Sequence, residues 1–204
     1  MPDITIQVTL FLSVFATAAM SASAAIQAVR HEFDAFGAAV LAAATAMGGG
    51  TVRDLLLGRT PVFWMTDLTY LATAVPVSLA VFFWARGLNP GNGRRHRMLM
   101  YFDAVGLALF TLTGLQIGLA AGMSAPIAII LGCITGTFGG MIRDVLCNVT
   151  PSVLKEDLYA TISLLGGALF LALDFAALGE LVAVCASFGV MFVMRVIVVA
   201  RSIR

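Results

Sequence analysis

Charged residues are scarce in this chain: Asp, Glu, Lys and Arg make up 11% of its 204 residues, whereas apolar residues make up 60%. A water-soluble domain needs a polar surface, and this composition does not supply one. The formal net charge is only +1, so nothing in the overall charge attracts nucleic acid. The composition therefore excludes a soluble globular domain, argues against a nucleic-acid partner and indicates a protein whose main solvent is lipid.

Residues with metal-binding or catalytic chemistry are also few. The three cysteines lack CxxC spacing, the two histidines, His31 and His96, lie far apart, and there is no HExxH motif. The stretch "MGGGTVRD" at 47–54 lacks the Lys-Ser/Thr ending of a phosphate-binding loop. We therefore expect no metal, no cofactor and no enzymatic activity.

Long apolar stretches are what the chain does contain. A membrane helix needs about 20 mainly apolar residues, and this criterion predicts an all-α integral membrane protein with seven transmembrane helices. The predicted spans are 4–28, 34–56, 67–86, 98–121, 125–147, 157–175 and 179–200. The 26 uncharged residues after Asp3 favour a retained first span over a cleavable signal peptide.

Positive charges fall mostly on one side of this seven-span arrangement. In membrane proteins the cytoplasmic loops are the ones that collect Lys and Arg. Only Arg59 lies in a loop on the other side. The side that carries most of the charge holds Arg30, Arg86, Arg94, Arg95, Arg97, Lys155, Arg201 and Arg204. We therefore expect a multi-pass protein of the inner (cytoplasmic) membrane, with the amino terminus outside and the carboxyl terminus in the cytoplasm. Arg195, near the end of the last span, is expected to reach the interface.

The chain contains an internal repeat with an offset of 90 residues. Under this offset eleven of the 28 positions from 41 to 68 are identical. Each copy holds three predicted spans, 4–86 in the first and 94–176 in the second, so the second copy enters the membrane from the opposite face. We expect one membrane domain, 1–204, built from two inverted three-helix repeats, with a seventh helix and cytoplasmic tail at 178–204.

Glycines interrupt the predicted helices at corresponding places in the two copies. These are Gly48, Gly49 and Gly50 in the first copy and Gly139 and Gly140 in the second. Glycine costs about 1 kcal/mol relative to alanine inside a helix, so we expect a kink or partial unwinding there. Inverted repeats with such interruptions indicate a solute pathway near the membrane midplane.

An arginine and an aspartate follow each glycine segment: Arg53 and Asp54 in the first copy, Arg143 and Asp144 in the second. A charge at membrane depth costs about 3 kcal/mol or more, so each arginine should be paired or hydrated and should lie over the glycines of its own helix face. Close helix packing by the small residues and interfacial anchoring by the charges are the alternative. Two copies in register favour a pathway with two constrictions, Arg53 toward the outer face and Arg143 toward the cytoplasm.

Three polar residues within the predicted spans have more than one interpretation. Asp103 has Ser13 as its repeat counterpart, and this acid either attracts cations at the cytoplasmic mouth or pairs with a loop arginine. Thr45 and Thr135 correspond under the repeat. Their hydroxyls either line a pore or bond back to their own helix.

The string "GGGTVRDLLLGRTPVFW" at 48–64, its weaker echo at 139–151 and the seven-span layout resemble the prokaryotic members of the trimeric intracellular cation channel family over nearly the whole chain. Related bacterial sequences carry the label of glycine-type transporters. The resemblance implies a homotrimer in membrane lipids, with a potassium-selective pore in each protomer formed by spans 1, 2, 4 and 5 and an accessory seventh span. Two positions depart from the pattern: Phe138 stands opposite Gly48 in the repeat, and Ser13 stands where an acid is expected.

The sequence therefore predicts a monovalent cation (potassium) channel with an hourglass pore, constricted at glycine-kinked helices 2 and 5. The alternative is a secondary transporter of a small zwitterion such as glycine, whose carboxylate Arg53 or Arg143 would hold. A structural protein whose small-residue helices only pack would carry no flux. A membrane enzyme is the least favoured class.

Overall fold

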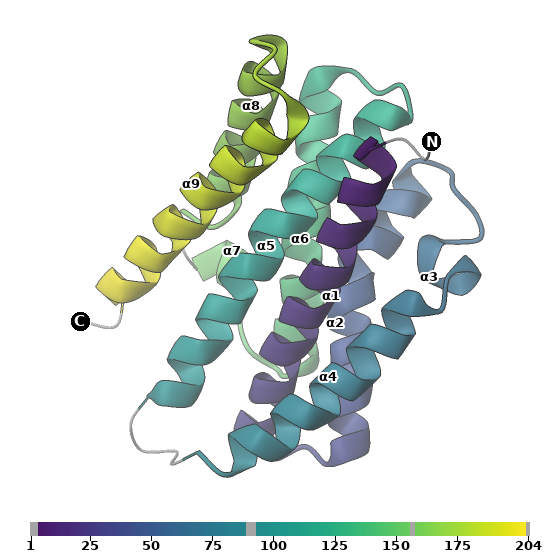
Figure 1. Cartoon of the computed structure of the whole chain (residues 1–204). Coiled ribbons are helices and arrows are strands. Elements are labelled where there is room, and N and C mark those ends of the chain that lie inside the picture. The colour runs from purple at the N-terminus through teal and green to yellow at the C-terminus, as the bar shows by residue number, and fades with distance from the viewer. Residues whose placement is uncertain (1–3, 89–92, 156–157, 203–204) are drawn as a thin grey trace.

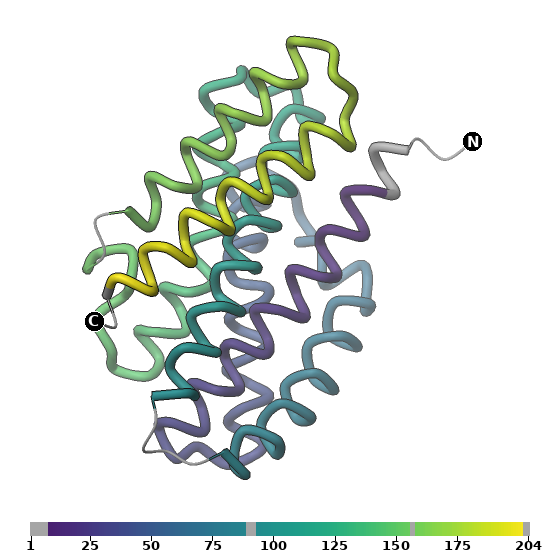
Figure 2. Tube along the Cα trace, turned by 60° about the vertical axis from the view of Figure 1, so that its left-hand side comes forward, coloured from purple at the N-terminus to yellow at the C-terminus, as the bar shows by residue number. Residues whose placement is uncertain are grey.

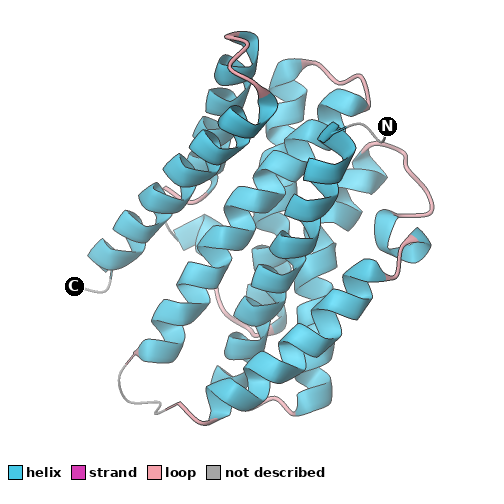
Figure 3. Ribbon diagram, in the orientation of Figure 1, coloured by secondary structure: helices cyan, strands magenta, loops and turns pink. Residues whose placement is uncertain are grey.

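The structure, a computed structural model, describes residues 4–88, 93–155 and 158–202. Within these ranges the chain forms nine helices and no strand (Figures 1 and 3). They are α1 (Ile4–Arg30), α2 (Ala35–Leu56), α3 (Phe63–Thr66), α4 (Thr69–Arg86), α5 (Arg94–Ala120), α6 (Ala125–Leu146), α7 (Ser152–Lys155), α8 (Ala160–Phe175) and α9 (Glu180–Ser202).

Six of these helices, α1, α2, α4, α5, α6 and α9, are long and apolar enough to cross a membrane. Helix α8 is apolar but shorter, with 16 residues. The prediction of an all-α membrane protein is therefore confirmed. Each of the seven predicted ranges overlaps one helix, and the one at 157–175 overlaps the shorter α8.

The structure corrects the predicted boundaries at several places. Helix α5 begins at Arg94, so the basic stretch 94–97 forms its first turn and is not part of a loop. The short helices α3 and α7, which follow α2 and α6, were not predicted. Residues 89–92, between the predicted spans 67–86 and 98–121, residues 156–157, at the start of the predicted span 157–175, and Arg204 lie outside the described residues.

Helices α1 and α5 run antiparallel to each other through the middle of the bundle (Figures 1 and 2). Helix α1 packs against α2 and α4, and α5 packs in the same way against α6 and α8. Helix α2 crosses α6, and α9 packs on α8 and α5. Buried alanines of α1, among them Ala16, Ala24 and Ala28, let neighbouring helices approach closely, as is common in membrane bundles.

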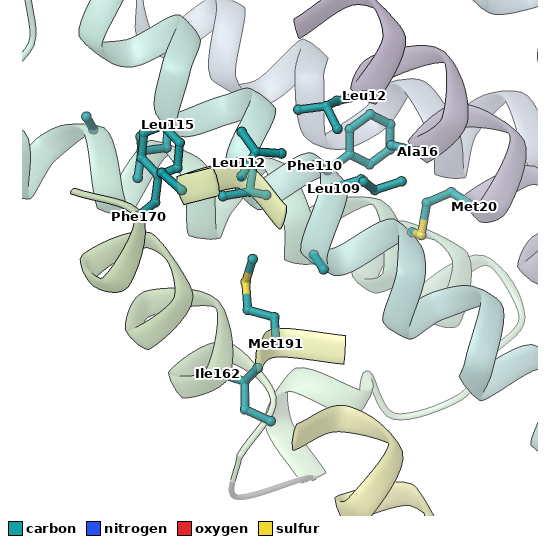
Figure 4. Packing of buried hydrophobic residues seen from close by; sticks show 14 of the residues in the cluster. Leu12, Ala16, Met20, Leu109, Phe110, Leu112, Leu115, Ile162, Phe170 and Met191 are labelled. Atoms are coloured by element: carbon teal, nitrogen blue, oxygen red, sulfur yellow. The ribbon is translucent and has the colours of Figure 1, made fainter. Parts of the chain in front are cut away.

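The largest apolar cluster joins α1 and α5 to α8 and α9 (Figure 4). It includes Leu12, Ala16, Met20, Leu109, Leu112, Leu115, Ile162, Phe170 and Met191. The outward faces of the helices are apolar too: Phe11, Phe83 and Leu165 are each more than half exposed. Such an apolar outer surface fits a lipid environment and does not fit water.

Basic residues gather at one end of the bundle. Arg30 ends α1, Arg86 ends α4 and Arg94 begins α5, and these three helix ends lie together at the bottom of Figure 1. This is the side on which the sequence placed most of its Lys and Arg residues.

Candidate functional site

The glycine segments lie where α2 crosses α6. Both helices remain α-helical through Gly48–Gly50 and through Gly139–Gly140. The expected partial unwinding is therefore wrong, because the backbone groups at the crossing keep their helical hydrogen bonds and need no cavity to satisfy them.

The two helices instead use the glycines to approach each other backbone to backbone. A Cβ on Gly49 would meet the carbonyl oxygen of Thr135, and a Cβ on Gly139 would meet the carbonyl oxygen of Thr45. A Cβ on Gly48 would meet the side chain of Ile142. The close-packing interpretation thus describes these three glycines, and the expected solute pathway is not open at them.

The threonines at this crossing bond back to their own helices. The Thr45 hydroxyl donates to the Leu41 carbonyl at 2.6 Å, and the Thr135 hydroxyl donates to the Leu131 carbonyl at 2.6 Å. Both residues are buried. Of the two interpretations open from the sequence, local back-bonding is therefore the one that their hydroxyls follow here.

The Arg53 cluster comprises Arg53, Asp54, Phe63 and Tyr70. The Nε and Nη2 atoms of Arg53 donate to Oδ1 of Asp54 at 2.9 and 2.7 Å, and the guanidinium carbon lies 5.4 Å from the centre of the Phe63 ring. Phe63 also meets Tyr70 edge to face, with ring centres 4.6 Å apart. The expected pairing of the arginine is confirmed, and its partner is the adjacent aspartate.

A cavity of about 50 Å³ lies beside this cluster, lined by Ser13, Gly50, Arg53, Phe63, Tyr70, Phe110, Thr113 and Ile117. A larger cavity of about 300 Å³, lined by Thr9, Leu10, Ser13, Tyr70, Gln116, Ile117 and Ala120, shares three of these residues and so adjoins it. Gly50 lines the smaller cavity, although a Cβ added to it would meet the Phe63 ring.

The Arg143 cluster comprises Arg143, Asp144, Asp103, Ser23, Tyr159 and Arg195. The Nη1 atom of Arg143 donates to Asp103 at 2.8 Å and to the Ser23 hydroxyl at 2.6 Å, while Nε donates to Asp144 at 2.9 Å. The Tyr159 hydroxyl donates to the other oxygen of Asp103 at 2.8 Å. A Cβ on Gly140 would lie 3.7 Å from Nη2 of Arg143, so the guanidinium lies beside this glycine as expected.

The sequence interpretations of two residues, Asp103 and Arg195, fail at this cluster. Asp103 is 1% exposed and pairs with arginines inside the bundle, so it lies neither at a mouth nor against a loop arginine. Arg195 is fully buried, 3.8 Å from Asp103 and 4.4 Å above the Tyr159 ring, and does not reach the interface. A buried charge needs a counter-charge, and Asp103 and Arg195 supply one to each other.

The two aspartates of the repeat have a second role that the sequence analysis missed. Oδ2 of Asp54 accepts from the backbone N–H of Phe63 at 2.9 Å, and Oδ2 of Asp144 accepts from the backbone N–H of Ser152 at 3.1 Å. These N–H groups begin the short helices α3 and α7, which need an acceptor at their amino-terminal ends. Each aspartate therefore binds both its arginine and the segment that follows its span.

Sequence reasoning also missed Ser23, Tyr159, Tyr70 and Arg195 as members of the clusters. A signal existed for Arg195, because a charged residue within an apolar segment marks a functional position by default. A signal existed for Ser23 as well, since its repeat counterpart is Thr113, which lines the cavity beside Arg53. The two tyrosines carry no such signal.

A model of one protein family, described as "Glycine transporter", matches residues 10–86 and 100–175. A UPF0126 membrane protein of Vibrio cholerae is 42% identical over 161 residues, which cover 76% of this chain and 64% of that protein. The chain therefore aligns with less than two thirds of the Vibrio protein's length. The UPF0126 inner membrane protein YadS of Escherichia coli K12 is 39% identical over 157 residues, or 77% of this chain and 74% of that protein.

Among solved structures, the TRIC trimeric intracellular cation channel orthologue from Rhodobacter sphaeroides has the same fold, with a TM-score of 0.89 and 39% sequence identity. The match covers 96% of this chain and 98% of the Rhodobacter chain.

Proposed function

The chain belongs to the glycine transporter family of membrane proteins, and on that premise we propose that it is a channel for monovalent cations, potassium foremost, that works as a homotrimer with one pore in each protomer. The Rhodobacter sphaeroides structure is described as a trimeric intracellular cation channel, and its fold extends over nearly all of both chains. A channel fold also favours transport over an enzymatic function. Membrane lipids surround the trimer.

The proposed organisation is seven crossings in two inverted three-helix repeats, 4–86 and 94–176, followed by a seventh helix and tail at 178–204. Helix α8 is the sixth crossing. Three observations support this arrangement: α1 and α5 run antiparallel (Figure 2), α2 and α6 meet through reciprocal glycine contacts, and the two ranges of the family match begin 90 residues apart.

The proposed pathway follows the two charged clusters and the glycine crossing between them. Its residues are Thr45, Gly48, Gly49, Gly50, Arg53, Asp54, Asp103, Thr135, Gly139, Gly140, Arg143 and Asp144. The observation that carries the proposal is that a buried arginine–aspartate pair stands on each side of the crossing. Each aspartate neutralises its arginine, which removes the repulsion that an unpaired arginine would exert on a passing cation.

The hourglass shape is also a proposal, with its constriction at the α2–α6 crossing. The cavities beside Arg53 form one side of it, and the Arg143 cluster closes the other. Since the crossing has no room for a Cβ, conduction requires α2 and α6 to separate or slide there. A glycine interface permits such sliding because few side chains interlock.

We further propose the inner membrane as the location, with the amino terminus outside and the carboxyl terminus in the cytoplasm. YadS of Escherichia coli is named an inner membrane protein. The gathering of Arg30, Arg86 and Arg94 at one end of the bundle supports the orientation, because cytoplasmic loops are the ones rich in arginine.

A planar bilayer recording tests the channel proposal. Purified protein in asymmetric potassium chloride should give single-channel steps whose reversal potential follows the potassium gradient. A silent membrane, or a reversal potential that follows chloride, contradicts it. Arg53→Ala and Arg143→Ala proteins serve as matched variants, since both charges lie in the proposed pathway.

A secondary carrier of a small zwitterion such as glycine is the second candidate, because the family model bears the description of a glycine transporter. A carrier should show saturable glycine uptake into liposomes, accelerated by internal glycine, without unitary currents. Absence of both flux and current would favour a purely structural role for the packed helices.

A further inference from the structure

The two charged clusters differ at one repeat position. The 90-residue offset places Ser13 opposite Asp103. In the Arg143 cluster the Asp103 carboxylate fills the space between the arginine and a tyrosine. In the Arg53 cluster, where the short Ser13 side chain stands instead, that space is the 50 Å³ cavity.

We propose that the cavity beside Arg53 binds a small carboxylate, in the place that the Asp103 side chain occupies beside Arg143. The ligand carboxylate accepts hydrogen bonds from Arg53 and Tyr70, as the Asp103 carboxylate does from Arg143 and Tyr159. The proposal uses Arg53, which is also part of the proposed cation pathway, but it does not depend on cation flux.

The arginine supplies the first donor. In the Arg143 cluster, Nη1 donates to Asp103 and Ser23. Nε and Nη2 of Arg53 both donate to Asp54, and among the described residues its Nη1 has no hydrogen-bond partner. Arg53 is 4% exposed and lines the cavity. A guanidinium nitrogen that faces a cavity can bind a ligand there, and a carboxylate is its strongest acceptor.

Tyrosine supplies the second donor. Tyr159 precedes α8, and its hydroxyl binds Asp103. Its counterpart under the offset is Thr69, the residue next to Tyr70, and Tyr70 is a buried lining residue of the cavity. The hydroxyls of Ser13 and Thr113 already donate to the carbonyls of Thr9 and Leu109, and the Tyr70 hydroxyl is hydrogen-bonded to the Ser13 side chain. Arg53 is thus the donor left to a ligand, and Tyr70 exchanges its Ser13 contact for the ligand carboxylate.

The cavity has the size of a small carboxylate. One water needs about 10–15 Å³ of such space, so 50 Å³ holds a carboxylate with one or two carbons. The adjoining cavity of about 300 Å³ includes Leu10, which is 47% exposed. This larger cavity provides room for the rest of the ligand.

Formal charge indicates which carboxylates bind more tightly. The Arg143 cluster is balanced because Arg195 and Arg143 face Asp103 and Asp144. Arg53 and Asp54 balance each other already, so a simple anion leaves one excess negative charge, whereas a zwitterion leaves none. Acetate and glycine are therefore the two probes, with glycine expected to bind more tightly.

Thermal unfolding of the purified protein in detergent tests the site without any ion gradient. At constant ionic strength, sodium acetate replacing sodium chloride should raise Tm to a plateau, and glycine should raise it at lower concentration. Arg53→Gln should weaken both effects about tenfold, the loss of one charged hydrogen bond. Equal Tm in chloride, acetate and glycine overturns the proposal, as does an acetate effect that Arg53→Gln leaves unchanged.

Ser13→Asp provides the sharper test, because it supplies the carboxylate from the chain itself. We expect this variant to have a higher Tm than Ser13→Asn, which has the same size without the charge, and to show no response to acetate. The proposal is overturned if the Ser13→Asp variant is no more stable than Ser13→Asn, or if it still responds to acetate. If the wild-type protein conducts potassium but does not bind carboxylates, the carboxylate site alone is refuted. If it binds acetate but does not conduct, the channel proposal alone is refuted.

Discussion

Nη1 of Arg143 donates a hydrogen bond to Oδ1 of Asp103 at 2.8 Å, although the two residues lie 40 positions apart and each side chain is only 1% exposed. This ion pair joins α5 to α6 directly. Tyr159 and Arg195 contact the same carboxylate, so Asp103 also connects these helices to the start of α8 and to α9.

Replacing Asp103 by asparagine should destabilise the protein strongly. The change keeps the size of the side chain but leaves Arg143 with one carboxylate partner, Asp144, and takes the Asp103 charge away from Arg195. Breaking a buried ion pair in this way costs about 3 kcal/mol or more. Unfolding in detergent, followed by fluorescence, measures the loss. Ser13→Asn at the corresponding repeat position is the control, and an equal effect of both changes would contradict the special role of Asp103.

Gly49→Ala and Gly139→Ala should each destabilise the α2–α6 crossing by about 1–3 kcal/mol, the usual cost of overpacking. The added methyl group meets the carbonyl oxygen of Thr135 or Thr45, and backbone cannot rotate away as a side chain can. Gly189→Ala in α9 is the matched control, because no atom lies within 4 Å of a Cβ there. That control should be neutral or stabilising by up to about 1 kcal/mol. Similar unfolding midpoints for all three variants would refute the close-contact account.

Arg195→Gln should lower stability by about 2 kcal/mol, because it removes a desolvated cation from the Tyr159 ring and from Asp103. Arg201→Gln, an exposed arginine in the last turn of the same helix, should change stability by less than about 0.5 kcal/mol. Denaturation of both variants in one detergent gives the comparison. Equal effects would mean that Arg195 is an interfacial anchor after all.

Arg53→Ala and Arg143→Ala should both alter conductance or gating while the trimer still assembles, because both arginines lie along the proposed pathway and are buried inside the protomer. The two should differ in stability, because Arg143→Ala removes an ion pair from both Asp103 and Asp144, whereas Arg53→Ala removes one from Asp54 alone. Bilayer recordings measure conductance and gating, and size-exclusion chromatography measures trimer assembly. Unchanged currents in both variants would reduce the arginines to structural anchors.

Much of the fold was predictable because membrane spans follow from local composition. The apolar runs predicted the helices to within a few residues, apart from the start of α5 and the short helices α3 and α7. The pairing of Arg53 with Asp54 was also accessible, since the two are adjacent in sequence. The position of Arg195 was not predictable. Its closeness to the end of a span suggested the interface, whereas its burial depends on how α9 packs against α5 and α8.

The glycines show the same limit. Their clustering in two aligned segments was visible in the sequence, but whether a glycine loosens a helix or admits a neighbour depends on what lies opposite it. Gly49 and Thr135 are 86 residues apart, and no local pattern predicts that the carbonyl of one helix will press against the other. The helices therefore stay intact where helix propensity alone suggested unwinding.

The sequence by itself determined the solvent, the helices and the repeat, because hydrophobic composition and self-similarity are properties of the chain read in order. The tertiary structure alone decided which charges meet: Asp103 with Arg143 and Arg195, and an open cavity at the equivalent place beside Arg53. The physical reason is that buried charges are stabilised by partners within a few ångströms, and those distances are fixed by the way distant helices cross.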